Sequence, residues 1–315
     1  MADVKKVATR TGYGEALKEL GAIHDNIVVF DADLAGSTQT GVFGKAFPDR
    51  HFNCGIAEQN MMDVAAGLSL TGNIAFTGSF AVFGTGRAYD QIRNTVCYAD
   101  LNVKVCPTHA GISVGPDGGT HQMIEDVSLM RTLPNMRVLV PADYASARAA
   151  LRLAAATPGP VYVRMGRANV PAVYGEGAQL RLGGSCVLRE GSDVTLVANG
   201  VEVEEALKAA DRLASEGVSA EVIDAYCVKP LDEETILTSL GKTGCGVVAE
   251  EHSVHGGLGS AVAELTAAQL PTPLAFIGMR DRFGKSGDFA ELLAFFEMDA
   301  AAIASAARMV VEKRA

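Results

Sequence analysis

Glu58 is the first residue whose type and position could do chemistry. It follows Gly55-Ile56-Ala57, at the point where a strand pattern over 51–54 gives way to a helical pattern over 57–70. A carboxylate in the first turn of a helix lies at the positive end of the helix dipole. Glu58 could have no role other than to stabilise the helix, or it could bind a polar atom of a ligand. Its position in the sequence is compatible with both interpretations.

Two aromatic residues, Phe80 and Phe83, follow the predicted strand 74–78 and precede a Gly-Thr-Gly turn. Ligands of open α/β sheets bind at the carboxyl ends of the strands. Rings placed there can hold a flat heteroaromatic group by offset or edge contact. Taken alone, two phenylalanines at this spacing are more often core residues, but their place after a strand favours the binding interpretation.

A glycine-rich loop carries the clearest cluster, which consists of His109, Asp117 and His121. Glycines at 111, 115, 118 and 119 let the backbone bend tightly and approach a ligand closely. The two histidines lie 12 positions apart, a separation that fits no compact zinc pattern. We therefore interpret both histidines as hydrogen-bond and proton-transfer partners for sugar oxygens, with Asp117 binding a hydroxyl.

The elements that must position these residues alternate between short β-branched runs and helical patterns, which is typical of a mostly parallel sheet with helices on both faces. The predicted strands of the first half cover 27–31, 51–54, 74–78, 103–107, 137–140 and 161–164. The predicted helices cover 13–20, 57–70, 85–98, 123–132 and 144–156. The helix over 57–70 has one apolar face, made by Met61, Val64, Ala65 and Leu68.

The regularity lapses between 168 and 191, where we expect an inter-domain connection with one hairpin. A second α/β unit follows. Its predicted strands cover 193–198, 220–224, 246–249 and 274–277, and its predicted helices cover 203–216, 233–240, 258–270, 289–296 and 300–311. The predicted fold class is therefore α/β with two doubly wound domains, at 1–168 and, smaller, at 192–315, joined by a linker at 169–191.

Composition excludes several classes of protein. Hydrophobic residues make up 48% and charged residues 20% of 315 residues, a balance typical of a compact globular chain. The net charge of −10 argues against nucleic-acid binding. No apolar run approaches the roughly 20 residues of a membrane span, and no signal peptide is apparent. Six widely spaced cysteines indicate free thiols, so we expect a cytoplasmic protein.

Four stretches together resemble the transketolase family: Gly55-Ile56-Ala57-Glu58-Gln59, Phe80-x-x-Phe83, the loop from Thr108-His109 to His121-Gln122, and Val140-Pro141-Ala142-Asp143. The similarity covers nearly the whole chain and matches the pyrimidine-binding and C-terminal domains of that family. The chain lacks the Gly-Asp-Gly pattern with a following Asn, through which the family binds magnesium and the diphosphate of thiamine diphosphate. The resemblance therefore implies the C-terminal subunit of a split transketolase.

That resemblance implies a cofactor, a partner and an assembly. The cofactor is thiamine diphosphate with Mg²⁺, and we expect the metal ligands on the partner and none on this chain. The partner is an N-terminal subunit that carries the diphosphate-binding domain. Together, in an α2β2 heterotetramer, the subunits would transfer a two-carbon ketol unit from a ketose phosphate to an aldose, with the cofactor supplying the difficult chemistry.

The resemblance also assigns residues to the cofactor. Glu58 corresponds to the glutamate that activates the cofactor through N1′ of its aminopyrimidine ring. Phe80 and Phe83 correspond to aromatic residues around that ring, and Asp33 corresponds to an aspartate near the cofactor and the subunit interface.

The substrate side follows in the same way. His109, Asp117 and His121 correspond to residues that contact the donor and acceptor sugars, and both histidines join Glu58 as expected catalytic residues. Arginines in the family's phosphate clamp make charge-assisted contacts to phosphate oxygens. In this chain the phosphate clamp corresponds to Arg10, Ser37 and Arg167.

The chain departs from the family at three positions, with Gln59, Ala110 and Gly86 where many members carry His, Asp and an aromatic residue. The first two also resemble deoxyxylulose-phosphate synthase, so a reaction of pyruvate is an alternative, in that manner or in that of a 2-oxo-acid dehydrogenase β subunit. A second alternative is a non-catalytic regulatory subunit of the same fold. Release of carbon dioxide from pyruvate would identify the first, and an unchanged activity on replacing Glu58 would identify the second.

The pair His252 and His255 allows a metal interpretation, but it offers only two nitrogen ligands next to a Gly-Gly turn. We interpret it as a structural or interface loop. Which sugars are substrates does not follow from the sequence.

Overall fold

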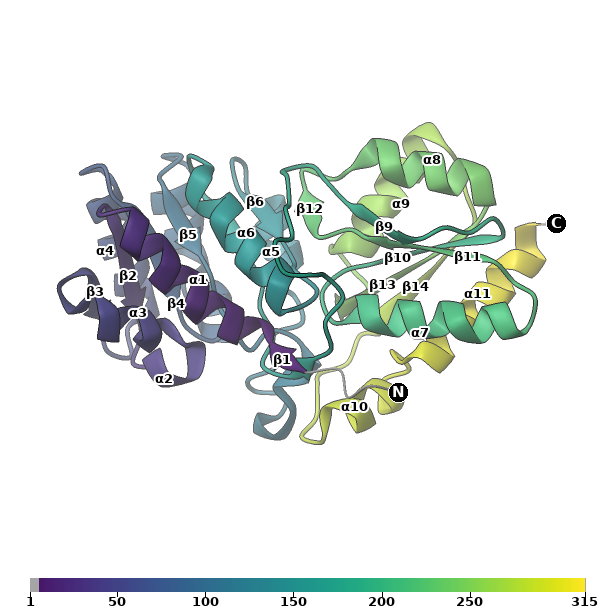
Figure 1. Ribbon diagram of the computed structural model, residues 1–315, viewed down its shortest axis with the longest axis horizontal. Coiled ribbons are helices and arrows are strands. Elements are labelled where there is room, and N and C mark those ends of the chain that lie inside the picture. Colours follow the sequence, from purple (N-terminus) through teal and green to yellow (C-terminus); the bar gives the residue numbers. More distant parts are fainter. Residues whose placement is uncertain (1–5, 315) are drawn as a thin grey trace.

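The computed structural model describes residues 6–314 and contains two main β-sheets that lie side by side along the long axis of the molecule (Figure 1). The first sheet has seven strands in the order β12-β6-β7-β5-β4-β2-β3, and the second has five in the order β14-β13-β10-β11-β9. A two-stranded ribbon, β1 with β8, adds a third pairing. The predicted α/β class with two doubly wound sheets is confirmed.

Six parallel strands form the body of the first sheet: β2 (Ile27–Asp31), β3 (His51–Asn53), β4 (Ile74–Gly78), β5 (Val103–Val105), β6 (Arg137–Leu139) and β7 (Val161–Val163). Two of these strands have the predicted bounds, and the others end one or two residues early. Every residue of β2 is buried, with Val28 and Phe30 in one core and Ile27 and Val29 in the other. Because successive side chains of a strand point to opposite faces, helices must cover both sides of this sheet.

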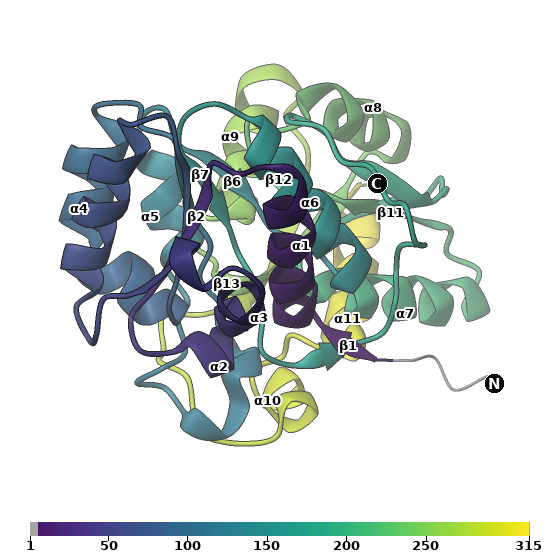
Figure 2. The same cartoon turned by 60° about the vertical axis from the view of Figure 1, so that its left-hand side comes forward.

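One face is covered by α1 (Thr9–Ile23), α3 (Thr40–Ala46) and α6 (Tyr144–Ala156), and α1 and α6 run side by side over it (Figure 2). The other face is covered by α4 (Glu58–Ser69), α5 (Asp126–Thr132) and a segment of two π-helical stretches, η2 (Val82–Arg87) and η3 (Gln91–Cys97). The prediction of one regular helix over 85–98 is therefore wrong, because the helical geometry breaks between the two stretches.

The predicted apolar face of α4 is only partly right. Met61 and Ala65 are buried, but Val64 is 45% exposed, and the core side is completed by Met62 and Ala66. Val64 therefore faces away from the sheet.

Four of the five strands of the second sheet are parallel: β10 (Val194–Ala198), β11 (Ala220–Asp224), β13 (Gly246–Ser253) and β14 (Leu274–Met279). On one face lie α7 (Glu202–Ser215) and α11 (Ala300–Arg314). On the other lie α8 (Glu233–Thr243) and α9 (Leu258–Gln269), whose apolar residues share one core with those of α4 and α5. Because this core is continuous, the two sheets are packed together rather than loosely tethered.

The segment between the two units contains no hairpin, so that prediction is wrong. Instead β8 (Asn169–Val170) pairs antiparallel with β1 (Val7–Ala8), and β9 (Cys186–Arg189) pairs antiparallel with β11. A further strand that was not predicted, β12 (Cys227–Lys229), leaves the second unit and pairs with β6 at the edge of the first sheet. β9 and β12 satisfy their backbone groups at the open edges of the two sheets, whereas β1 and β8 pair with each other in a separate ribbon.

The remaining short elements lie in connections: α2 (Ala35–Thr38), η1 (Pro48–Arg50), the 3₁₀ segment η4 (Ile112–Asp117) and α10 (Phe289–Phe295). The loop before α10 packs on the glycine-rich loop of the first unit, where Gln122 Nε2 donates to the carbonyl oxygen of Lys285 at 2.9 Å. All six cysteines are free thiols. Within residues 6–314, no helix combines the length and apolar character needed to cross a membrane.

Candidate active site

The predicted site residues meet at the carboxyl edge of the first sheet. Asp33 follows β2, Phe80 follows β4 and His109 follows β5, while Glu58 begins α4 after the turn that follows β3. Parallel strands bring such positions together at one edge, which is where α/β proteins bind ligands. The fold therefore gathers residues that lie far apart in the sequence.

A stack of rings forms the centre of this edge. The rings of Phe80 and His109 lie 3.8 Å apart between centroids with an interplanar angle of 22°. Phe83 lies nearly parallel to Phe80 at 6.1 Å, and the ring of His121 meets Phe83 edge-on at 5.4 Å. The structure thus brings both predicted aromatics and both predicted histidines into one cluster.

His109 is fixed as a neutral ring. Its Nε2 lies 3.4 Å from Arg10 Nη1, and because a guanidinium can only donate, Nε2 must accept. Nδ1 therefore carries the proton and donates to Thr108 Oγ1 at 2.8 Å. Burial, together with the positive charges of Arg10 and Arg167, lowers the pKa of His109 to about 3. The residue also adopts a φ of 60°, which is uncommon outside glycine and marks a position held by its surroundings.

Two arginines lie beside His109. Arg10 Nη1 donates to the carbonyl oxygen of Ser37 at 2.8 Å, and Arg167 Nη1 donates to the carbonyl oxygen of Val114 at 3.2 Å. Burial and the neighbouring Arg167 lower the pKa of Arg10. Two like charges held this close favour a bound anion, because phosphate oxygens match the planar donors of guanidinium groups.

The other two residues predicted to bind ligands lie at the rim of this cluster. Asp117 is exposed at the end of η4, near enough to Arg10 for its charge to raise the pKa of the guanidinium. Asp33 is also exposed, and its Oδ1 accepts a hydrogen bond from Asn53 Nδ2 at 3.2 Å. Asn53 Oδ1 in turn accepts from Gly55 N, so Asp33 is linked to the turn that precedes Glu58 rather than to the ring stack.

Glu58 is 2% exposed, and Arg87 Nη1 donates to its Oε2 at 2.8 Å. The same guanidinium lies over the ring of Phe83, with Cζ 4.5 Å from the centroid. The sequence analysis missed Arg87. The signal was available, because residues four apart in a helical segment lie on one face and Arg87 follows Phe83 by four positions.

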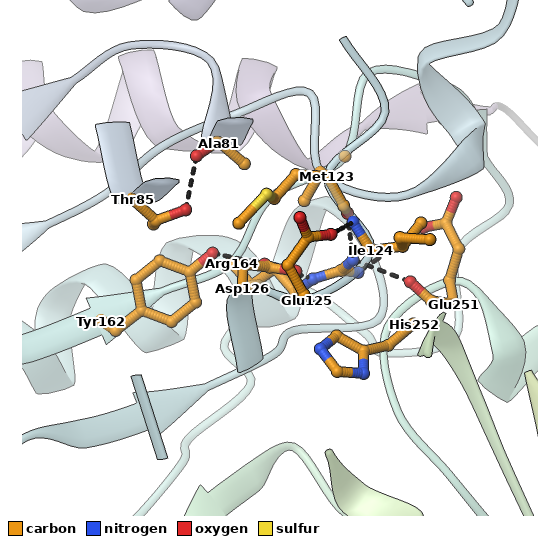
Figure 3. A network of polar contacts seen from close by, with 12 residues as sticks. Ala81, Thr85, Met123, Ile124, Glu125, Asp126, Tyr162, Arg164, Glu251 and His252 are labelled. Carbon is orange, nitrogen blue, oxygen red and sulfur yellow. Dashed lines mark hydrogen bonds and ion pairs between the residues drawn. The ribbon is translucent and has the colours of Figure 1, made fainter. Parts of the chain in front are cut away.

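A buried network of polar side chains joins the two units (Figure 3). Asp126 Oδ2 accepts from Arg164 Nε at 2.7 Å and from Tyr162 Oη at 2.5 Å, while Arg164 Nη2 donates to the carbonyl oxygen of Glu251 at 2.8 Å. Burial alone would raise the pKa of Asp126, but the Arg164 charge and the hydrogen bonds overcome that effect and hold it below its usual range. The network fixes the start of α5 and the end of β13 against each other.

Glu251 also holds the glycine-rich loop. Its Oε1 accepts from Ser113 N in a short hydrogen bond, and its Oε2 accepts from Ser113 Oγ at 3.3 Å. The carboxylate lies so close to Gly111 that a Cβ there would meet it, which explains a glycine with a φ of +73° at this position. Burial raises the pKa of Glu251 to about 7, although Arg164 Nη1 lies 3.6 Å from Oε2.

Of the two C-terminal histidines, His252 is structural. Its Nδ1 donates to the carbonyl oxygen of Ser253 at 2.7 Å, and its Nε2 accepts from Ser128 N at 3.3 Å, so neither nitrogen is left for a metal. His255 is exposed. Among residues 6–314, no group of three or more His, Cys, Asp or Glu side chains could hold a metal ion.

Comparisons with known proteins identify the family of this chain. The family model described as transketolase, pyrimidine binding domain, matches residues 5–173, and the model described as transketolase, C-terminal domain, matches residues 183–303. The chain belongs to the transketolase family. Its residues match the pyrimidine-binding and C-terminal domains of that family, as those of the C-terminal subunits of split transketolases do.

The relatives support this division. A protein of Methanocaldococcus jannaschii described as a transketolase C-terminal section is 49% identical over 94% of this chain and 93% of its own length. The 6-deoxy-6-sulfo-D-fructose transketolase subunit SqwH of a Clostridium species is 44% identical over 97% of this chain and 95% of its own. Human transketolase is 36% identical over 98% of this chain but only 50% of its own length.

A solved structure shows the same arrangement. The structure titled "Split gene transketolase, inactive beta4 tetramer" is 48% identical and superposes with a TM-score of 0.90, over 98% of this chain and 100% of the other.

Membership of the family implies dependence on thiamine diphosphate, and the site fits its aminopyrimidine ring. That ring is flat and bears nitrogen groups in its plane. Arg87 already places a flat, nitrogen-bearing group between the Glu58 carboxylate and the Phe83 ring. A flat group that bonds to the carboxylate and lies on the Phe83 ring is therefore accommodated there.

Proposed function

We propose that this chain is the C-terminal subunit of a two-subunit transketolase that moves a two-carbon ketol unit from a ketose phosphate to an aldose. The observation that carries the proposal is the meeting of a buried carboxylate, two aromatic rings, two histidines and an arginine pair at one sheet edge. Within the described residues this site has no metal-binding group. We infer that Mg²⁺ and the cofactor's diphosphate are bound by the partner subunit.

Glu58 would hold a proton between its carboxylate and N1′ of the aminopyrimidine. Bound thiamine diphosphate supplies the carbon nucleophile of the reaction. Phe80 and Phe83 would hold the pyrimidine by ring contact, and Asp33 would support the turn before Glu58 through Asn53. The burial of Glu58 makes its hydrogen bond to a ligand stronger than the same bond in water.

The substrate's ends would be bound by different groups. The phosphate clamp (Arg10, Ser37 and Arg167) would bind the phosphate of the ketose donor. His109 is neutral and His121 lies beside the same rings, so both could accept or donate hydrogen bonds to sugar oxygens. Asp117, at the exposed end of η4, would bind a sugar hydroxyl.

The surface around Glu58 suits a protein partner. Phe52 is 40% exposed and Ile56 is 79% exposed in the turn that leads to Glu58, and Val64 is exposed on α4. Apolar side chains that gather on a surface commonly mark protein interfaces. We place the N-terminal subunit over this surface, in an α2β2 heterotetramer that completes the site.

Two further assignments complete the proposal. We assign residues 1–168 to the pyrimidine-binding domain, 169–191 to a linker and 192–315 to the C-terminal domain, although β12 adds a strand from the last to the sheet of the first. The six free thiols fit a reducing compartment, and we propose the cytoplasm.

Relatives act on different donors by name, since one is an apulose-4-phosphate transketolase subunit and another a 6-deoxy-6-sulfo-D-fructose transketolase subunit. An arginine pair binds a phosphate or a sulfonate by the same contacts. We therefore propose an anionic ketose as the donor class.

The test is ketol transfer from xylulose 5-phosphate to ribose 5-phosphate, with the tagged chain isolated from its own host together with its partner. Magnesium and thiamine diphosphate are added. Activity in the complex that is lost when the partner is removed supports the proposal. Turnover by the isolated chain would refute the split-subunit part, and release of carbon dioxide from pyruvate would refute the reaction.

A further inference from the structure

We propose that Arg87 competes with the aminopyrimidine ring of thiamine diphosphate for Glu58 and Phe83, and that it leaves both groups when the cofactor binds. This inference rests on the proposed function, because it takes Glu58 and Phe83 as the groups that receive the ring. It goes beyond that function by assigning a role to a residue that the family match leaves without one.

The contacts of Arg87 are those expected of the ring. Nη1 donates to Glu58 Oε2 at 2.8 Å, and Cζ lies 4.5 Å from the centroid of Phe83. A guanidinium is flat, carries its donors in the plane and stacks on aromatic faces. An aminopyrimidine that bonds to Glu58 and stacks on Phe83 uses the same two side chains, so the two groups compete for them.

Local structure explains how Arg87 reaches this position. It stands four residues after Phe83 in the helical stretch η2, which puts both side chains on one face. The preceding residue, Gly86, has no side chain, and only Met123 Cε lies within 4 Å of the place of a Cβ there, at 3.8 Å. The guanidinium lies directly over the Phe83 ring.

The two members of the ion pair differ in their access to water. The Glu58 side chain is 2% exposed, whereas the Arg87 side chain is 47% exposed. Arg87 can therefore swing into solvent, while Glu58 is held in place and needs a partner at all times, because a buried unpaired carboxylate is costly.

Before the cofactor can bind, the contacts of Arg87 with Glu58 and Phe83 must be broken. The free energy of these contacts is therefore subtracted from the free energy of cofactor binding. A half-exposed ion pair and an exposed cation–π contact are each weak. Removing Arg87 should therefore tighten the binding of thiamine diphosphate by about 3- to 30-fold.

The experiment is equilibrium dialysis of thiamine diphosphate, with magnesium in excess, against the complex of this chain with its copurified partner. The variants are Arg87→Ala and Arg87→Gln, and the matched control is Arg93→Ala, an exposed arginine in the adjacent π-helical stretch. We expect both Arg87 variants to bind the cofactor more tightly than wild type and the control to bind as wild type does.

Thermal melting of the free chain, without cofactor, gives a second readout. Arg87→Ala should lower the melting temperature because Glu58 loses its partner, and Glu58→Gln should remove most of that difference. Equal or weaker cofactor binding by both Arg87 variants would overturn the competition. If the wild-type complex does not bind thiamine diphosphate at all, the proposed function fails instead, so the two failures are distinguishable.

Discussion

The buried pair of Asp126 and Arg164 offers the sharpest test of how the two units are held together. Arg164 Nε lies 2.7 Å from Asp126 Oδ2, and the two side chains are 6% and 0% exposed. Removing one charge from such a pair leaves the other buried and unpaired, at a cost of about 3–5 kcal/mol in the free energy of unfolding. Asp126→Asn keeps an oxygen for Tyr162, so we expect the lower part of that range.

The expected change in melting temperature follows from the size of the chain. An unfolding entropy of about 2 cal/mol/K per residue over 315 residues means that each kcal/mol shifts the melting temperature by roughly 1.5 °C. Asp126→Asn should therefore melt about 5 °C below wild type at pH 7, in calorimetric scans at one fixed rate. The matched control is Glu216→Gln, which removes a charge from the exposed pair with Arg308 and should shift the melting temperature by about 1 °C or less.

The pH dependence adds an independent check. The pKa of Asp126 is lowered in the folded chain. A carboxyl with a lowered pKa stabilises the fold fully above its unfolded value near pH 4, and that stability is lost as the pH falls through the folded pKa. The difference in melting temperature between wild type and Asp126→Asn should therefore become smaller as the pH falls below about 4. An Asn variant as stable as wild type at pH 7, or a difference that is undiminished at pH 2, would refute the reasoning.

Two further predictions concern titration within the site. The pKa of His109 is lowered to about 3, so its ring should stay neutral, with the proton on Nδ1, from pH 5 to 9; ¹⁵N chemical shifts of the ring that move between these values would contradict this. The pKa of Glu251 is raised to about 7, so the folded chain binds the extra proton between about pH 4.3 and 7 and loses stability as the pH rises through that window. In denaturant unfolding, the free energy of unfolding of Glu251→Gln should accordingly rise relative to that of wild type from pH 5 to 8. A difference between the two free energies that is constant with pH would contradict this.

The sequence was sufficient for features that depend on local patterns. Buried apolar runs such as Ile27–Asp31 and Ile74–Gly78 predicted strands with the right bounds, because a strand covered on both faces is apolar throughout. The site edge was also predictable, since Glu58, Phe80 and His109 each follow a strand. The neutral state of His109 was not, because it depends on Arg10, which lies 99 positions away.

Features that depend on contacts between distant segments could not be predicted from the sequence. Nothing local shows that Cys227–Lys229 joins the first sheet, or that Glu251 binds Ser113 across 138 positions. The helical spacing of Val64 predicted a core position, but the residue is exposed. Periodicity alone cannot distinguish a residue at the centre of an apolar helix face from one at its edge. Arg87 was missed because its partner, Glu58, lies 29 positions away in the sequence.

The measurement that tests the central claim most directly is ketol transfer by the complex containing Glu58→Gln, with assembly and thiamine diphosphate binding measured on the same samples. If Glu58 holds the proton at N1′, the variant should assemble and lose activity by about 10²-fold or more. Glu234→Gln, which changes an exposed carboxylate on α8, should retain wild-type activity. An assembled Glu58→Gln complex whose activity stays within a few-fold of wild type would contradict the account.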